Sequence, residues 1–251
     1  MSNSPANKFS KKGLGSCSEA TTPAELGRLH LGWYYNWRSF PIIAPVPEVE
    51  FVPMFWGAMN VTPENLEAVR KSGATHVLGF NEPDMINQSN LTPEECLNLW
   101  PKLMTLDQRL GSPAPANSTW LDEFIPEAKR RGLRVDFVCL HMYPDISHPD
   151  AADWVAKMIE DAHRKFGLPI WLTETGAADV AAWNHPRVCK PTPEMARSFL
   201  KKLLGLLEGL PFLERYAWFA DRVGVEYALG TIFHPNSSRL TMLGTNFRDG
   251  G

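Results

Sequence analysis

Residues 76–84 read His-Val-Leu-Gly-Phe-Asn-Glu-Pro-Asp, an apolar run that stops on an amide, a carboxylate and a proline. The apolar residues fit a strand that is buried on both faces, and Pro83 neither donates to a β-ladder nor favours a helical backbone at Glu82. The strand therefore presents Asn81 and Glu82 at its carboxyl end. In parallel sheets and barrels this end carries the reactive groups, although a turn or helix-capping role fits the Asn-Glu-Pro triplet alone equally well.

A second apolar run ends in the same way. Residues 170–176 read Ile-Trp-Leu-Thr-Glu-Thr-Gly, so Glu174 also follows a buried strand, and the glycine after it allows the chain to turn. Glycoside hydrolysis requires two carboxyl groups, one that protonates the leaving oxygen and one that attacks the sugar or activates water. The pair of strand-end glutamates therefore indicates a glycosidase more specifically than either glutamate alone.

The pattern of strands and helices predicts an α/β fold, a single (β/α)8 TIM barrel with some short or missing helices. Repeated βα units imply a parallel sheet, and eight of them imply closure into a barrel. Helices open at Thr22, Thr62, Thr92 and Thr192, each followed by proline, and no helix is expected near residues 41–47. The expected strands are Lys12–Cys17, Leu31–Trp37, Phe51–Gly57, the run before Glu82, Leu110–Pro115, Val135–Tyr143, the run before Glu174, and Arg215–Asp221.

The size of the chain fits one domain. We expect residues 1–251 to form a single catalytic domain, with residues 1–11 as a flexible tail and the stretch after the last strand as a polar tail with a hairpin. The amino terminus lacks the apolar core of a signal peptide, so we expect a cytoplasmic protein or a secreted one that has lost its leader.

Composition narrows the choice of ligand. The net charge is −3 with no block of like charge, which argues against nucleic acid or an anionic membrane as a partner and favours a neutral substrate. Aromatic residues make up 11% of the chain and include 9 Trp, which suits stacking against sugar rings as well as core packing. The four cysteines, Cys17, Cys96, Cys139 and Cys189, show no Cys-x-x-Cys spacing, which argues against a zinc site or redox pair and leaves their disulfide state open.

Five motifs in order along the chain carry a family resemblance. They are Gly-Trp-Tyr-Tyr-Asn-Trp at 32–37, Phe-Val-Pro-Met-Phe-Trp-Gly at 51–57, Leu-Gly-Phe-Asn-Glu-Pro-Asp at 78–84, His-Met-Tyr at 141–143 and Trp-Leu-Thr-Glu-Thr-Gly at 171–176. This set resembles glycoside hydrolase family 128, within the retaining glycosidases of clan A. The resemblance implies cleavage of β-1,3-glucan, usually internal and with retention, by Glu82 as general acid/base after strand four and Glu174 as nucleophile after strand seven.

Candidate substrate-binding residues surround the two glutamates. Asn81 offers two donors and an acceptor and would bind the sugar 2-hydroxyl. Tyr143 and His141, which alternation places on one face of their strand with Cys139, would hold the nucleophile or sugar hydroxyls. The other candidates are Trp37, Trp56 and Trp218 at strand mouths, Trp120 and Trp183 on loops, and Tyr35 and Asn36.

No cofactor or metal is expected. Asp145, His148 and Asp150 could form a metal site, but a turn followed by a helix cap near Asp150 explains these residues better. Two other functions remain open: a non-catalytic β-1,3-glucan-binding protein on the same barrel, and an exo-acting β-1,3-glucanase. In each case we expect a monomer whose partner is a β-1,3-glucan polysaccharide or oligosaccharide.

Overall fold

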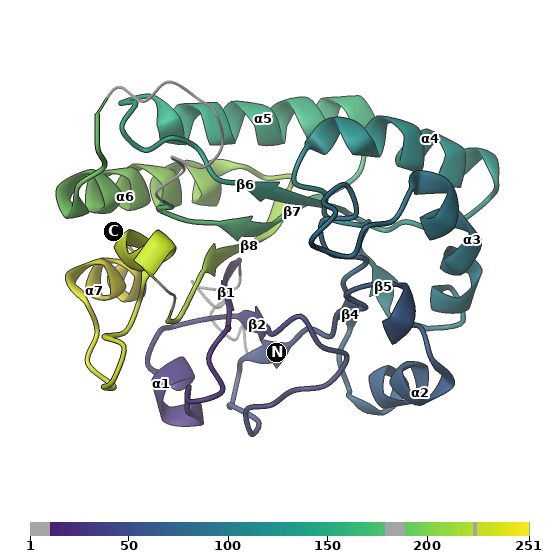
Figure 1. Ribbon diagram of the computed structural model, residues 1–251, viewed down its shortest axis with the longest axis horizontal. Helices are drawn as coiled ribbons and strands as arrows, with labels where there is room; N and C mark the ends of the chain where they lie inside the picture. The colour runs from purple at the N-terminus through teal and green to yellow at the C-terminus, as the bar shows by residue number, and fades with distance from the viewer. Residues whose placement is uncertain (1–10, 179–188, 223–224, 251) are drawn as a thin grey trace, which may run out of the picture.

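The computed structural model describes residues 11–178, 189–222 and 225–250 and contains two sets of parallel strands. Six strands lie in the order β3-β2-β1-β8-β7-β6, and β4 pairs with β5 (Figure 1). The strands are β1 Lys12–Gly15, β2 Trp33–Tyr35, β3 Glu50–Phe51, β4 His76–Val77, β5 Arg109–Leu110, β6 Val138–Met142, β7 Ile170–Thr175 and β8 Leu213–Phe219.

Two isolated parallel bridges join these sets into a ring. Met54 bridges to Leu78, which links the chain after β3 to the chain after β4, and Gly111 bridges to Phe137, which links the chain after β5 to the chain before β6. The amide of Ser112 also donates to the carbonyl of Phe137 over 2.9 Å. All eight strands therefore follow one another around a barrel, and the predicted (β/α)8 architecture is confirmed.

Threonine caps and glycine turns fix the helix ends. Each of the four predicted Thr-Pro openings is a helix start at which the threonine hydroxyl accepts a backbone N–H. Gly73 and Gly167, with φ of 74° and 66°, stand just beyond two helices. The helices are α1 Pro23–Gly27, α2 Pro63–Lys71, α3 Pro93–Leu103, α4 Leu121–Arg130, α5 Ala151–Phe166, α6 Pro193–Gly209 and α7 Met242–Asp249, with 3-10 turns η1 Ala58–Asn60, η2 Ser118–Trp120 and η4 Val225–Gly230.

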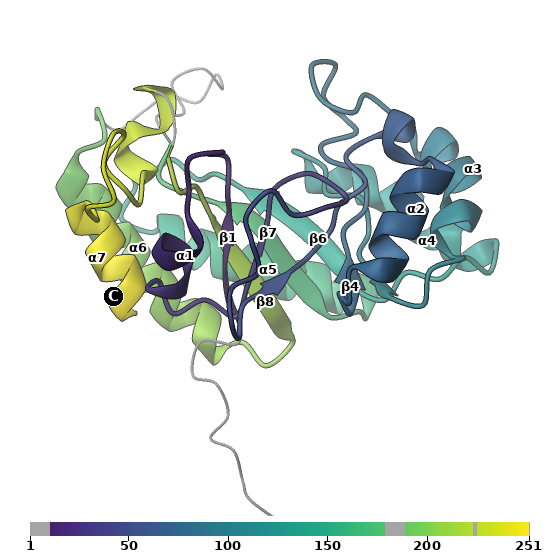
Figure 2. The same ribbon diagram turned by 90° about the horizontal axis from the view of Figure 1, so that it is seen from below.

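The hydrophobic core has an inner and an outer part. Inside the barrel, Trp171 lies between Phe137 and Trp33, with ring centroids 4.2 and 5.1 Å away. The outer core fills the space between the strands and the helices, and Figure 2 shows helices to the left of, to the right of and behind the strands. The inner core consists of Trp33, Tyr35, Val52, Met54, Leu78, Ala114, Phe137, Cys139, Trp171 and Ala217. The inner core therefore lies directly below the residues at the carboxyl ends of the strands.

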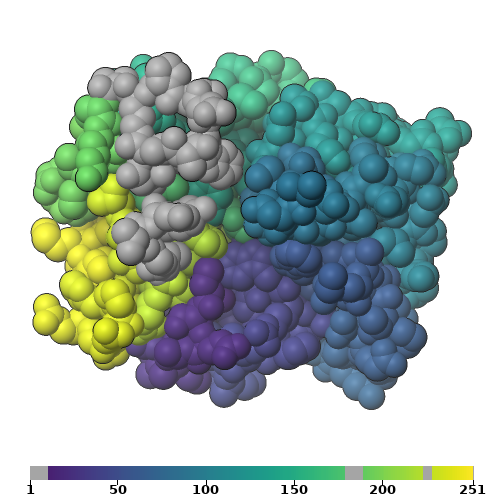
Figure 3. All heavy atoms as spheres, in the orientation of Figure 1, coloured from purple at the N-terminus to yellow at the C-terminus, as the bar shows by residue number. Residues whose placement is uncertain are grey.

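The carboxyl-terminal segment differs from the expected polar tail. Phe233 and Leu240 form an antiparallel bridge as in a hairpin, but the chain then continues into α7, where Leu243 and Phe247 are buried. Lys12 of β1 donates to the carbonyl of Phe247 over 2.7 Å and ties this helix to the first strand. The space-filling view shows the early and late parts of the chain side by side (Figure 3).

Other boundaries are also corrected. The third strand is much shorter than predicted because Pro53 has no N–H for the ladder, although Met54 still bridges across. Residues 1–10 of the expected amino-terminal tail lie outside the described residues.

Within the part of the chain that the structure describes, no helix is both long and apolar enough to cross a membrane.

Candidate active site

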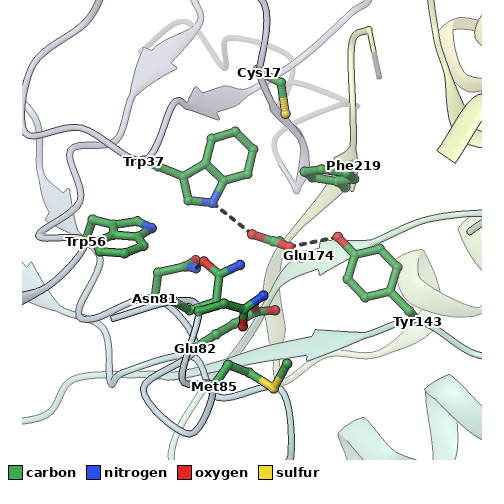
Figure 4. Close-up of a pocket in the computed structure, with 11 residues that line it drawn as sticks. Cys17, Trp37, Trp56, Asn81, Glu82, Met85, Tyr143, Glu174 and Phe219 are labelled. Atoms are coloured by element: carbon green, nitrogen blue, oxygen red, sulfur yellow. Dashed lines mark hydrogen bonds between the residues drawn. The ribbon is translucent and has the colours of Figure 1, made fainter. Parts of the chain in front are cut away.

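The carboxyl ends of four strands bring the candidate residues together. Glu174 belongs to β7, Tyr143 directly follows β6, Trp37 comes two residues after β2, and Glu82 lies beyond β4. Figure 4 shows these side chains turned toward one another around a single pocket. The pocket has a volume of about 420 Å³. This is the end of a (β/α)8 barrel at which active sites are assembled.

Three side chains donate hydrogen bonds to the carboxylate of Glu174. The hydroxyl of Tyr35 and the indole N–H of Trp37 donate to Oε1 over 3.0 and 2.9 Å. The hydroxyl of Tyr143 donates to Oε2 over 2.7 Å. Glu174 is only 6% exposed, so these bonds fix its orientation and compensate for the water that its charge has lost.

The two tyrosines remain donors across the neutral pH range. Burial raises the pKa of Tyr35 well above its ordinary value, and the negative charge of Glu174 adds to the effect. The pKa of Tyr143 is raised in the same way, by burial first and by Glu174 next. Both phenols therefore keep their protons, and Glu174 keeps its donors.

Glu82 has an unusual backbone. Its φ is 38°, in the left-handed region that residues other than glycine rarely adopt. Its amide donates to the carbonyl of Ala114 over 2.8 Å, which holds this conformation in place. Such conformations cost about 1–3 kcal/mol and cluster at functional sites. Trp37, with a φ of 58°, is a second example in the same pocket.

His141 lies between the two carboxylates. Its Nδ1 is 3.0 Å from Oε1 of Glu82, and its Nε2 is 3.5 Å from Oε1 of Glu174. Burial alone would lower the pKa of His141, but the charge of Glu174 and the hydrogen bond to Glu82 outweigh it, and the pKa is raised. A proton on this imidazole offsets part of the negative charge that the two glutamates bring together.

The same three residues are the group that could bind a metal ion among the described residues. One ligand atom each from Glu82, His141 and Glu174 lie within 4.8 Å of one another. However, Tyr35, Trp37 and Tyr143 aim hydrogen-bond donors at Glu174, and a cation would have to compete with them. The donor set fits an anionic carboxylate better than a metal ligand.

Several sequence predictions fall in this pocket. Asn81, Trp37, Trp56 and Tyr143 line it together with the two glutamates. The amide nitrogen of Asn81 donates to Gln88 over 3.1 Å, while its Oδ1 is buried and has no hydrogen-bond partner. This oxygen is available to accept a hydrogen bond from a ligand hydroxyl.

The structure corrects three predicted placements. Trp218 is buried in the outer core, where its indole donates to the carbonyl of Gly230, because alternation along β8 turns its neighbour Phe219 into the pocket instead. Asn36 is also buried, and its side chain donates to the carbonyl of Phe40 and closes a turn.

Trp120 stacks on Phe124, with ring centroids 5.6 Å apart, and does not line the pocket. The physical reason is that Trp120 ends a 3-10 turn packed on α4 rather than lying on an open loop. Trp183 lies outside the described residues.

Sequence reasoning missed a further set of lining residues. They lie on loops or at the end of β8, and no local sequence signal marks them. Phe219 was missed because its neighbour Trp218 was expected at the strand mouth, and alternation puts the two side chains on opposite faces. Partial enclosure raises the pKa of Cys17, as do the charges of Asp221 and Glu174, so its side chain faces the pocket as a neutral thiol. The missed residues are Cys17, Met85, Asn87, Gln88 and Phe219.

Known proteins are similar to this chain in sequence and in fold. The sequence model described as "Glycosyl hydrolase catalytic core" matches residues 15–247. The crystal structure of a GH128 (subgroup I) endo-β-1,3-glucanase from Amycolatopsis mediterranei, in complex with laminaritriose, is 33% identical. It superposes with a TM-score of 0.86 and covers 96% of this chain and 100% of its own.

Two more distant proteins are also similar. A GH128 (subgroup II) endo-β-1,3-glucanase from Sorangium cellulosum is 26% identical, with a TM-score of 0.80 and coverage of 96% of this chain and 98% of its own. Alkali-sensitive linkage protein 1 from Schizosaccharomyces pombe is 29% identical over 209 residues, which are 80% of this chain. The match spans only 36% of the length of that curated relative.

Proposed function

The chain belongs to glycoside hydrolase family 128, and from this premise we propose that it hydrolyses internal bonds of β-1,3-glucan with retention at the anomeric carbon. One observation carries the mechanism. A carboxylate oxygen of Glu82 and a carboxylate oxygen of Glu174 lie within 4.8 Å of each other. Retaining enzymes keep their carboxyl groups about 5–5.5 Å apart, whereas inverting enzymes need about 6.5–9.5 Å to admit a water molecule.

In the first step Glu174 acts as the nucleophile. One carboxylate oxygen attacks the anomeric carbon, and the bond from that carbon to the glycosidic oxygen breaks. Glu82 gives its proton to the departing oxygen, which leaves as the hydroxyl of the shortened chain. The donors from Tyr35, Trp37 and Tyr143 hold the attacking carboxylate in one orientation, and such positioning lowers the barrier.

In the second step Glu82 acts as a base. Once Glu174 is esterified its negative charge is gone, which favours the ionised form of Glu82. Glu82 then takes a proton from water, the water oxygen attacks the anomeric carbon, and the bond to Glu174 breaks. Two displacements at one carbon return it to its original configuration.

His141 lies within hydrogen-bonding distance of Glu82, the proposed acid/base. When His141 is a cation it donates from Nδ1 to an ionised Glu82, and when it is neutral Glu82 can keep the proton that the leaving oxygen needs. We therefore assign His141 a positioning role that orients the carboxyl group of Glu82.

Sugar recognition rests on the walls of the pocket. The unpartnered Oδ1 of Asn81 would accept a hydrogen bond from the 2-hydroxyl of the sugar that Glu174 attacks. Hydrogen bonds to this hydroxyl strengthen in the transition state. Trp37 and Trp56 present indole rings against which a pyranose can stack.

Matched variants test this function on laminarin. Glu82→Gln and Glu174→Gln should each remove most of the release of reducing ends while leaving the melting temperature near that of the wild type. Glu64→Gln, a change of the same kind in the exposed first turn of α2, serves as the control and should keep full activity. Near-normal turnover in either pocket variant would rule out the mechanism.

Product analysis separates the other two functions. A non-catalytic glucan-binding protein would bind laminarin without shortening it. An exo-acting enzyme would release one small product from the start, whereas internal cleavage gives a mixture of lengths. Azide distinguishes the two glutamates. In Glu82→Ala, azide can attack the anomeric carbon of the glycosyl–Glu174 ester without help from a base, so the bond to Glu174 breaks and a β-glycosyl azide forms. Glu174→Ala cannot form that ester and therefore cannot give the β-glycosyl azide.

A further inference from the structure

A second pocket adjoins the candidate active site and is not used by the mechanism above. It has a volume of about 560 Å³ and lies where the loop after β6 enters α5. Tyr143 lines both pockets, so the two pockets meet at this one side chain. The second pocket is lined by Tyr143, Pro144, Asp145, His148, Asp150, Ala151 and Trp154.

Trp154 is the aromatic wall of this pocket. It is 49% exposed, and it lies off the stripe of α5 residues, such as Val155 and Ile159, that is fully buried. Core packing therefore does not explain a tryptophan at this position. A half-exposed indole offers a flat apolar face to a ligand and an N–H at its edge.

The polar groups of the pocket are also available for a ligand. Oδ1 of Asp145 accepts the amide of Ser147 over 3.0 Å, which confirms the predicted turn, whereas its Oδ2 is buried and has no hydrogen-bond partner. The nearest basic group, Nε2 of His148, is 3.9 Å from that oxygen, too far for a hydrogen bond. Asp150 is the N-cap residue of α5, but its side chain makes no capping hydrogen bond, contrary to the prediction that it caps this helix.

An indole face beside unpaired carboxylate oxygens matches the chemistry of a pyranose, which has an apolar C–H face and a rim of hydroxyl donors. Pockets of this kind bind small ligands through apolar walls and a few convergent polar groups. We propose that this pocket is a subsite for a further glucose residue of the β-1,3-glucan chain, stacked on Trp154 and hydrogen-bonded to Asp145. The inference rests on the proposed function, since the chain must first occupy the neighbouring pocket and cross Tyr143.

Binding by chains of different length tests the subsite. In a Glu174→Gln background, the dissociation constants of laminaritriose and laminarihexaose are measured by calorimetry with and without Trp154→Ala. Loss of one aromatic stacking partner should weaken hexasaccharide binding about 3- to 10-fold, and the ratio of hexasaccharide to trisaccharide dissociation constants should rise. Asp145→Asn keeps the acceptor for Ser147 and replaces Oδ2 with a donor, so it should shift the ratio in the same direction.

Phe40→Ala provides the matched control, because Phe40 is a similarly exposed aromatic residue (46%) that lines neither pocket. The subsite is overturned if Trp154→Ala changes hexasaccharide binding no more than Phe40→Ala does, or if it weakens both oligosaccharides equally. Failure of the proposed function looks different: the wild type would then leave both oligosaccharides unshortened, whether or not it binds them.

Discussion

Replacing Tyr143 with phenylalanine removes one hydroxyl and leaves the aromatic ring. The lost group donates to Oε2 of Glu174 over 2.7 Å, and no other donor to that oxygen is found among the described residues. A hydrogen bond to a charged group contributes about 1.5–3 kcal/mol. Since each 1.4 kcal/mol or so corresponds to a tenfold change in rate, kcat/KM on laminarin should fall about 10- to 150-fold.

Tyr35→Phe should have a smaller effect. The single proton of the Tyr35 hydroxyl is shared between Oε1 of Glu174 and the carbonyl of Thr173, each 3.0 Å away, and Trp37 supplies Oε1 with another donor. We expect a decrease in kcat/KM of about 2- to 10-fold for this variant. The predicted order of the two tyrosines follows directly from how many donors each oxygen of Glu174 receives.

Initial rates of reducing-end release, measured over a range of laminarin concentrations, provide the assay. Tyr34→Phe is the matched control, because its hydroxyl points away from the site to the carbonyl of Ile43 over 3.4 Å, and it should remain within twofold of the wild type. The reasoning is refuted if Tyr143→Phe also stays within twofold, or if Tyr35→Phe loses more activity than Tyr143→Phe.

Three further predictions concern stability. The folded-state pKa of His141 is raised above 6.5, so the protonated imidazole stabilises the fold fully below pH 6.5, and this contribution is lost as pH rises through the folded-state pKa. His141→Asn should therefore lower the unfolding free energy more at pH 6 than at pH 9, as measured by urea denaturation. An equal or opposite difference would contradict this prediction. Gly79→Ala would place a Cβ 2.8 Å from the backbone of Ser112 and should cost about 1–3 kcal/mol of unfolding free energy, whereas Gly205→Ala in α6 meets no atom within 4 Å and should gain about 0.5–1 kcal/mol; melting curves that rank the two in reverse would contradict this. Buried Asp221 accepts hydrogen bonds from Ser16, Thr21 and the amide of Cys17, so Asp221→Asn should lower the unfolding free energy by about 1.5–3 kcal/mol, and unchanged chemical denaturation would show that these bonds contribute nothing.

The sequence predicted the barrel because its signals are local. Threonine followed by proline marks helix starts through one side-chain hydrogen bond, and apolar runs of strand length mark the parallel strands. The two glutamates were found for the same reason, since each directly follows such a run. Strand ends were predicted less well: Pro53 stands inside the predicted strand and shortens β3 by removing a ladder donor, a signal that the apolar run around it outweighed in the prediction.

The walls of the pocket depend on register and on distant packing, which a single strand does not encode. Trp218 and Phe219 are adjacent aromatic residues at the end of β8, and the register of the closed barrel decides that Phe219 faces the pocket while Trp218 packs outward. Trp120 is taken out of the pocket by its stack on Phe124. In the same way α7 exists because Leu243 and Phe247 meet the outer core, although their segment is otherwise polar.

The configuration of the first product tests the central claim most directly. Proton NMR during the first minutes of laminarin cleavage, before the new reducing ends mutarotate, distinguishes the two anomers. Two displacements through Glu174 predict that the β-anomer forms first and the α-anomer grows in only later. Initial appearance of the α-anomer would mean direct attack by water, and would contradict the role of Glu174 as nucleophile.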